Sequence, residues 1–181
     1  MIKGHVNIDF ITDDMLEELV FTEKTETREA GGYWNTLGIS TPNFPVDADI
    51  VYQTFGDSCP SWVNNVKYLF DNWLKYSMVT INKLTPGCFI PPHKDKFHRL
   101  FEFAKNNNID LTNKEPIRIN LFLQDHKIGH FFEMENEVCM NYKKGDYAII
   151  RLDKIHSVIN IGNENRYTLQ VSGFADKDTF K

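Results

Sequence analysis

Hydrophobic and polar residues alternate along the second half of the chain with the period of two that is typical of β-strands. The clearest examples are the segments 116–124 and 166–174, in which every second residue is apolar. Turn-forming sequences separate such segments: TPG at 85–87, KKGD at 143–146 and GNEN at 162–165. The pattern therefore predicts a series of short strands from residue 78 onward.

The first third of the chain has helical and loop-forming patterns instead. Residues 12–20 predict a helix that Thr12 caps and that has acidic residues in its first turn. Apolar residues recur every three to four positions over 59–76, which predicts the clearest helix of the chain. Residues 29–57 are rich in Gly, Asn, Pro, Thr and Asp, so we expect mostly loop with short strands there.

Short strands that follow a helical and loop-rich segment indicate a mainly β fold with flanking helices, in a single domain of residues 1–181. We expect residues 1–77 to pack on a sandwich or barrel core formed by 78–174. Two strands carry an arginine, Arg118 and Arg166, on the face that alternates with the apolar one. That polar face either meets solvent or lines an interior site, where a buried arginine needs an anionic partner.

Composition and charge narrow the classes of function. A length of 181 residues with 41% hydrophobic and 13% aromatic residues suits one globular domain. The net charge of −5 argues against nucleic-acid binding, although a local basic groove is compatible with it. The sequence lacks a signal peptide pattern and a membrane-spanning window, so we expect a cytoplasmic protein with no membrane partner. The three cysteines are widely spaced and fit unpaired thiols in a reducing compartment.

The segment FIPPHKD, residues 89–95, carries the first candidate for chemistry. His93 and Asp95 are two positions apart on a predicted extended backbone, so both side chains can hold one metal ion. Oxygen-activating non-haem Fe(II) is held by two histidines and one carboxylate on one face. His156, at the start of a predicted strand, is the best third ligand. The weaker candidates are His130, as runner-up, then His98 and His126.

Arg166 strengthens the case for His156. It lies ten residues beyond His156, across the GNEN turn, and is expected on the neighbouring antiparallel strand. An arginine there can bind a carboxylate through two parallel hydrogen bonds, and Thr168 faces the same way. A metal with open positions and a deeper arginine suit a ligand that chelates at one end and carries a carboxylate at the other. 2-Oxoglutarate has that shape.

Residues 78–174 resemble the double-stranded β-helix core, a jelly-roll or cupin-like fold, of the Fe(II)/2-oxoglutarate-dependent oxygenases. INKLTPGCFIPPHKD, residues 81–95, is similar to the strand, Pro-Gly turn and His-x-Asp of prolyl-hydroxylase-like members. RINLFL, YKKGDYAII, IHSVIN and RYTLQVSG follow in the order of the corresponding segments in those enzymes. The stretch from RINL to RYTLQV also resembles aspartyl/asparaginyl β-hydroxylases.

This resemblance implies that His93, Asp95 and His156 ligate Fe(II). It also implies that Arg166 binds the far carboxylate of 2-oxoglutarate, with Thr168 where related enzymes carry a Ser or Thr. The implied cofactors are thus Fe(II), 2-oxoglutarate as co-substrate, and O₂.

Three further positions show how the chain agrees with and departs from the two branches. Arg118 and Asn120 match a pair that helps to hold the co-substrate in the aspartyl-hydroxylase-like branch, where the second residue is histidine. Leu84 stands where prolyl-hydroxylase-like enzymes often carry a tyrosine. The carboxylate ligand, Asp95, is often absent from aspartyl-hydroxylase-like enzymes, so the metal site is closer to the prolyl branch.

The implied activity is hydroxylation of an unactivated C–H bond in a peptidyl side chain, a free amino acid or another small molecule. The polar run 96–115 is expected to frame the entrance, with a short helix over Arg99–Lys105. Two alternatives stay open: a non-catalytic metal- or ligand-binding β-barrel module, and a cupin-like isomerase or hydrolase that uses the metal as a Lewis acid. Four phenylalanines are expected either to pack the core or to exclude water from the site: Phe89, Phe122, Phe131 and Phe132.

Overall fold

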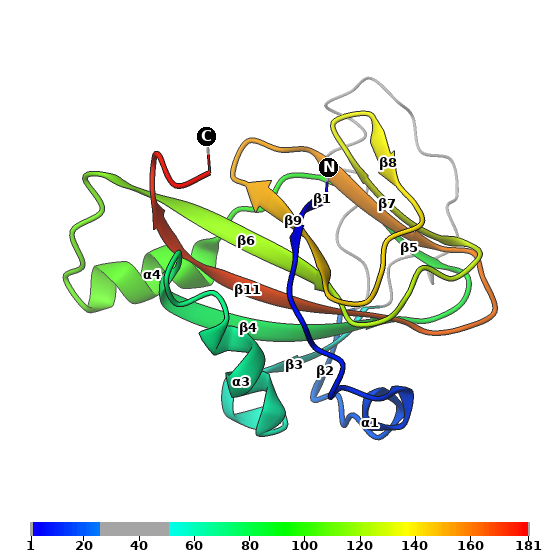
Figure 1. Ribbon diagram of the computed structural model, residues 1–181. Helices are drawn as coiled ribbons and strands as arrows, with labels where there is room; N and C mark the ends of the chain where they lie inside the picture. The colour runs from blue at the N-terminus through cyan, green and yellow to red at the C-terminus, as the bar shows by residue number, and fades with distance from the viewer. Residues whose placement is uncertain (1, 26–50, 181) are drawn as a thin grey trace.

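The computed structural model describes residues 2–25 and 51–180, which form two facing antiparallel β-sheets with short helices outside them (Figure 1). The large sheet has the order β1 (Ile2–His5), β9 (Asp146–Arg151), β6 (Lys114–Phe122), β11 (Arg166–Asp176), β4 (Lys75–Leu84), β3 (Val51–Phe55) and β2 (Glu23–Thr25). The small sheet has the order β5 (Cys88–His93), β10 (His156–Asn160), β7 (His130–Met134) and β8 (Glu137–Cys139). The mainly β, two-sheet architecture predicted from the sequence is confirmed.

The described residues form four short helical segments beside the sheets: α1 (Asp13–Glu17), the 3-10 helix η1 (Gly56–Ser58), α3 (Trp62–Tyr68) and α4 (His98–Asn106). The predicted cap of α1 is present, because Thr12 Oγ1 accepts a hydrogen bond from the Met15 amide at 3.3 Å. α4 forms within the polar run where a short helix was expected. Among the described residues, no helix is long and apolar enough to cross a membrane.

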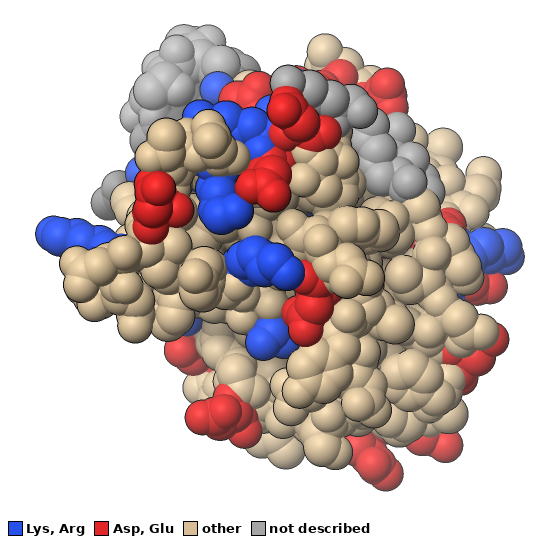
Figure 2. Space-filling view, turned by 60° about the vertical axis from the view of Figure 1, so that its left-hand side comes forward, with Lys and Arg blue, Asp and Glu red and all other residues tan. Residues whose placement is uncertain are grey.

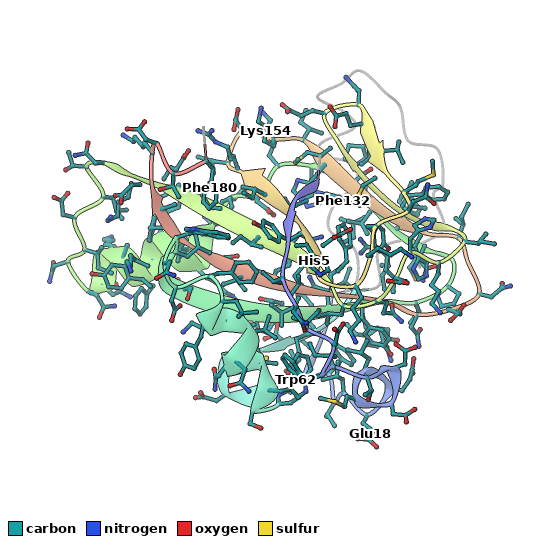
Figure 3. All side chains as sticks on the ribbon, viewed as in Figure 1. His5, Glu18, Trp62, Phe132, Lys154 and Phe180 are labelled. Carbon is teal, nitrogen blue, oxygen red and sulfur yellow. The ribbon has the colours of Figure 1, made fainter. Side chains whose placement is uncertain are left out.

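The outer face of the large sheet packs against α1 and α3 and forms the larger hydrophobic core (Figure 1). The apolar residues that alternate along β6 and β11 point to this side, as their spacing predicts. Figure 3 shows Trp62 on this helical side and Phe132 on the opposite side, between the sheets. Five of these strand residues are completely buried: Ile117, Ile119, Leu121, Leu169 and Val171.

The inner face of the large sheet meets the small sheet across a second, smaller apolar cluster that includes Phe122, Phe132, Ile150 and Val158. Buried polar residues share this inner space with the apolar ones. They are Asn82, Asn120, Arg166 and Thr168 from the large sheet, and His156 and Asn160 from the small one. The buried polar groups that could bind a ligand inside the protein therefore lie between the sheets.

The helix predicted over 59–76 is shorter than the sequence suggests. α3 ends at Tyr68, the Phe70 amide then donates to a carbonyl three residues back at 3.0 Å, and β4 already begins at Lys75. Phe70 and Leu74 are nevertheless buried in the outer core. Consecutive turns after α3 keep the apolar side chains on one side of the chain. The spacing of three to four residues therefore continues beyond the end of the helix.

The predicted pairing of the strands on either side of the GNEN turn is wrong. β10 pairs with β5 and β7 in the small sheet, whereas β11 pairs with β4 and β6 in the large one. Asn160, fully buried at the end of β10, donates from Nδ2 to the Leu84 carbonyl at 2.8 Å and to the Glu164 carbonyl at 2.9 Å. These bonds direct the chain from one sheet to the other, and Arg166 reaches the inner space from the facing sheet.

The first 77 residues contribute more strand than expected. β1, β2 and β3 extend the two edges of the large sheet, with β1 beside β9 and β3 beside β4. Of the segment 29–57, expected to be mostly loop, the part before residue 51 lies outside the described residues, and 51–55 form β3.

Candidate functional site

The predicted metal ligands lie together at one end of the small sheet. His93 ends β5 and His156 begins β10, and the two residues are direct partners across these antiparallel strands. Asp95 follows His93 by two residues and is 6% exposed. One ligand atom from each of the three side chains lies within 4.8 Å of the others. Two histidines and one carboxylate are thus brought to one place by strand pairing.

Both histidines are oriented for metal binding by backbone carbonyls. Nδ1 of His93 lies 2.8 Å from the Pro91 carbonyl, and Nδ1 of His156 lies 3.3 Å from the Lys154 carbonyl. Because a carbonyl can only accept, each Nδ1 carries the proton and each Nε2 presents a lone pair. The two Nε2 atoms lie 3.9 and 3.8 Å from the Asp95 carboxylate. Ligands at right angles around a metal, with bonds of ~2.1 Å, lie ~3 Å apart, so small side-chain movements suffice to bind an ion.

Arg118 completes the surroundings of Asp95. Its Nη1 lies 2.8 Å from Asp95 Oδ2, and its Nε donates to Ser172 Oγ at 3.0 Å. The guanidinium also lies over the Phe97 ring, 5.2 Å from its centroid. Phe97 is 6% exposed and has a φ of 50°, in the left-handed region that bulky residues avoid. Tight packing therefore fixes the segment that carries Asp95, as is common near functional sites.

An inner cavity of about 310 Å³ opens beside the two histidines, between the sheets. A row of hydrogen-bonding side chains from the large sheet forms one wall: Gln53, Thr80, Asn82, Asn120 and Gln170. Apolar residues line it as well: Val51, Ile90, Phe132, Ile150 and Val158. Gln53 donates to Asn82 at 2.9 Å and Gln170 to Asn120 at 3.4 Å. The cavity is a space of mixed polar and apolar lining and of the size of a small metabolite.

Arg166 and Thr168 are buried on the same inner face but are not among the residues that line the cavity. Arg166 is 3% exposed, and its Nε and Nη2 have no hydrogen-bond partner among the described residues. Its guanidinium lies 5.7 Å from the Phe122 ring centroid and donates a hydrogen bond to the Tyr142 hydroxyl. Burial raises the pKa of Tyr142, and the positive charge of Arg166 partly opposes this shift. A buried guanidinium without an anion is rare in proteins, which marks this position as unusual.

The other histidine candidates lie away from the metal ligands. His130 is buried and its Nε2 lies 3.0 Å from the Glu164 carbonyl, while His126 Nε2 lies 2.9 Å from the His130 carbonyl. His98 is exposed at the start of α4. Of the four phenylalanines proposed to exclude water, Phe132 lines the inner cavity.

Some residues that shape the site were not singled out from the sequence. Thr80 and Asn82 alternate with buried apolar residues along β4, and this alternation could have identified them. Gln53 lies in a stretch of sequence with no comparable signal. The contact of Arg118 with Asp95 joins β6 to the segment after β5. No pattern of residues in the local sequence predicts a contact between such distant segments.

Comparisons with known proteins establish the fold. The sequence matches no protein-family model, and it matches no curated protein. A prolyl-4-hydroxylase from Pseudomonas putida is 13% identical, with 81% of this chain and 82% of that chain covered and a TM-score of 0.52. A predicted oxalate decarboxylase from Thermotoga maritima is 18% identical over 68% and 80% of the two chains, with a TM-score of 0.41. A cupin protein from Bacteroides fragilis is 15% identical over 77% and 87%, with a TM-score of 0.39. At 13% identity the similarity to the prolyl-4-hydroxylase shows a shared fold, in agreement with the two-sheet jelly-roll architecture, and no particular activity.

Proposed function

We propose that this protein is an Fe(II)- and 2-oxoglutarate-dependent dioxygenase that hydroxylates an unactivated C–H bond of a peptidyl side chain or an amino acid. The metal ligands alone do not discriminate between the activities of jelly-roll proteins. The observation that carries the proposal is Arg166, a buried guanidinium with two nitrogen atoms that lack partners among the described residues. The site is thus suited to a dianionic co-substrate.

The location of Arg166 relative to the inner cavity supports this assignment. Arg166 pairs with Leu84 across β11 and β4, and Leu84 pairs with Val51 across β4 and β3. Val51 lines the cavity, so the cavity reaches the cross-strand row that also contains Arg166, with β4 between the two residues. The Tyr142 hydroxyl beside Arg166 offers the hydrogen bond that Leu84 cannot make.

In this proposal each residue has a distinct task. His93, Asp95 and His156 hold the iron on one face, while Arg118 keeps the Asp95 carboxylate in place. Arg166 binds the far carboxylate of 2-oxoglutarate. The bound iron would supply O₂ activation, in which 2-oxoglutarate, O₂ and the substrate C–H give succinate, CO₂ and the hydroxylated product.

A second candidate is a metal-dependent isomerase or hydrolase. It is favoured by one observation: Arg166 and Thr168 are not cavity-lining residues, and the wall beside the histidines is made of amides and Thr80. In this case the metal acts as a Lewis acid and the amides bind a neutral polar substrate. Such an enzyme makes no use of a carboxylate at Arg166.

An anaerobic titration with Fe(II) and then 2-oxoglutarate distinguishes the two candidates. We expect the visible charge-transfer band of the chelate in the parent, its loss in His156→Ala, and no change in His98→Ala, which alters an exposed histidine. Arg166→Ala should still bind metal but should bind 2-oxoglutarate about 100-fold more weakly, because a bidentate charge-assisted contact is removed. A metal-loaded parent without the band, or equal 2-oxoglutarate affinity in Arg166→Ala, would overturn the proposal.

A further inference from the structure

A second hollow, here called the outer groove, adjoins the inner cavity at the metal ligands. It has a volume of about 1750 Å³ and lies between η1, the start of α3, the start of α4 and the segment 93–97. Five residues line both spaces: Phe55, Thr80, His93, Arg99 and Arg118. A molecule in the outer groove can therefore reach the candidate metal ligands at the junction of the two spaces.

The outer groove is basic although the protein as a whole is acidic, with a net charge of −5. Lys67, Lys94, Lys96 and Arg99 line it, and among the described residues Asp57 is the one acidic residue there apart from Asp95. Asp95 is already paired with Arg118 at 2.8 Å. Figure 2 shows Lys and Arg beside Asp and Glu on one face of the molecule. In the groove, Arg99 lies 3.6 Å from Glu23 at the junction with the inner cavity. Lys67, Lys94 and Lys96 therefore give the described lining of the groove its excess of positive charge, which favours anions.

The size of the outer groove favours a polypeptide over a small anion. Sites for small molecules are typically ~300–1,000 Å³, a range that the inner cavity fits and the outer groove exceeds. Its walls also include apolar side chains, among them Met78 and Phe101. A large open groove with both apolar and basic side chains suits an extended chain that carries acidic side chains.

We infer that the outer groove binds an acidic polypeptide segment and presents one of its side chains to the metal position. The part of this inference that makes the segment a substrate rests on the proposed function. Lys67 on α3 and Lys96 after β5 would contact acidic side chains on opposite walls. His93 and Arg118, at the junction of both spaces, would meet the side chain that reacts.

Fluorescence anisotropy of a rhodamine-labelled peptide of alternating Glu and Ala tests the binding without metal or co-substrate. At low salt we expect this peptide to bind at least about tenfold more tightly than its counterpart with Gln in place of Glu. Lys67→Glu and Lys96→Glu should each weaken binding by about three- to tenfold. Lys105→Glu makes the same charge change at an exposed α4 residue outside the groove, and should leave binding as in the parent.

Four results would overturn the inference. They are equal affinity for the Glu and Gln peptides, equal weakening by Lys105→Glu, equally tight binding of labelled oligo-dT, and displacement of the peptide by free citrate at comparable concentration. The chelate band of Lys67→Glu separates this inference from the proposed function. A normal band without peptide binding overturns the groove assignment alone, whereas peptide binding without a band in the parent overturns the dioxygenase alone.

Discussion

The two faces of the large sheet are built from the same strands but differ in what they contribute. On the outer face, Leu169 and Val171 are completely buried against the helical layer. On the inner face of the same strand, Arg166 and Thr168 are buried beside a cavity, and Gln170 lines it. Neighbouring residues of β11 therefore face opposite sides of the sheet. One side chain packs in the core that stabilises the fold, and the next faces the space between the sheets.

This difference explains why polar groups are tolerated inside a small protein. Complete burial of an aliphatic side chain contributes about 1.5–3 kcal/mol, and the outer core contains many such side chains. The inner face can therefore retain groups whose burial costs free energy. We expect substitutions on the two faces to separate stability from ligand binding.

The largest expected effect on the free energy of unfolding comes from a substitution on the outer face. Leu169→Ala should lower the free energy of unfolding by about 3 kcal/mol, because it leaves a cavity in a fully buried core. Urea denaturation of the parent and the variant measures this loss. Gln170→Ala, the next residue on the opposite face, should change stability far less, and a comparable loss there would contradict the division between the faces.

The strands on which this prediction depends, β6 and β11, could be predicted from the sequence. β6 and β11 are long strands with strict alternation, so both their existence and their buried face followed from the period of two. The GNEN turn was misread because local sequence shows that a strand ends but not which sheet the next one enters. The hydrogen bond of Asn160 to the distant Leu84 carbonyl accompanies that change of sheet, and it depends on the assembled fold.

A smaller effect of opposite sign is expected on the inner face. Arg166→Met should raise the free energy of unfolding by about 1 kcal/mol, because it removes a buried cation that has no carboxylate partner among the described residues. The measurement is again urea denaturation, with retained metal binding as the test that the inner site is intact. A large loss of stability would show that Arg166 is a structural residue instead of a ligand-binding one.

The smallest effect concerns His130, which lies on the small sheet. Burial, with a contribution from the Arg166 charge, lowers the pKa of His130 below its ordinary value of 6.5. The unfolded state therefore binds a proton more readily, and stability should be complete above the ordinary value and fall as the pH drops below it. His130→Gln should flatten the decline in urea midpoint between neutral and mildly acidic pH. His98→Gln, an exposed control, should follow the parent, and parallel declines in all three proteins would contradict the prediction.

The candidate site was predictable to the extent that it depends on spacing. The His-x-Asp motif places both side chains on one side of an extended segment, and His156 was preferred for its position at a strand start. The contact of Arg118 with Asp95 and the amide wall of the cavity were not predictable, because they arise where strands distant in sequence meet.

The five residues from His93 to Phe97 alternate between the interior and the surface. His93 and Asp95 face the metal position and Phe97 lies beneath Arg118, whereas Lys94 and Lys96 are exposed in the outer groove. In the proposed function the same peptide would carry two metal ligands at odd positions, and in the inferred groove it would make partner contacts at its even ones. Lys94 and Lys96 can be substituted without changing a candidate metal ligand. The preference of the groove for a partner can therefore change in evolution, or be redesigned in the laboratory, while the metal ligands stay the same.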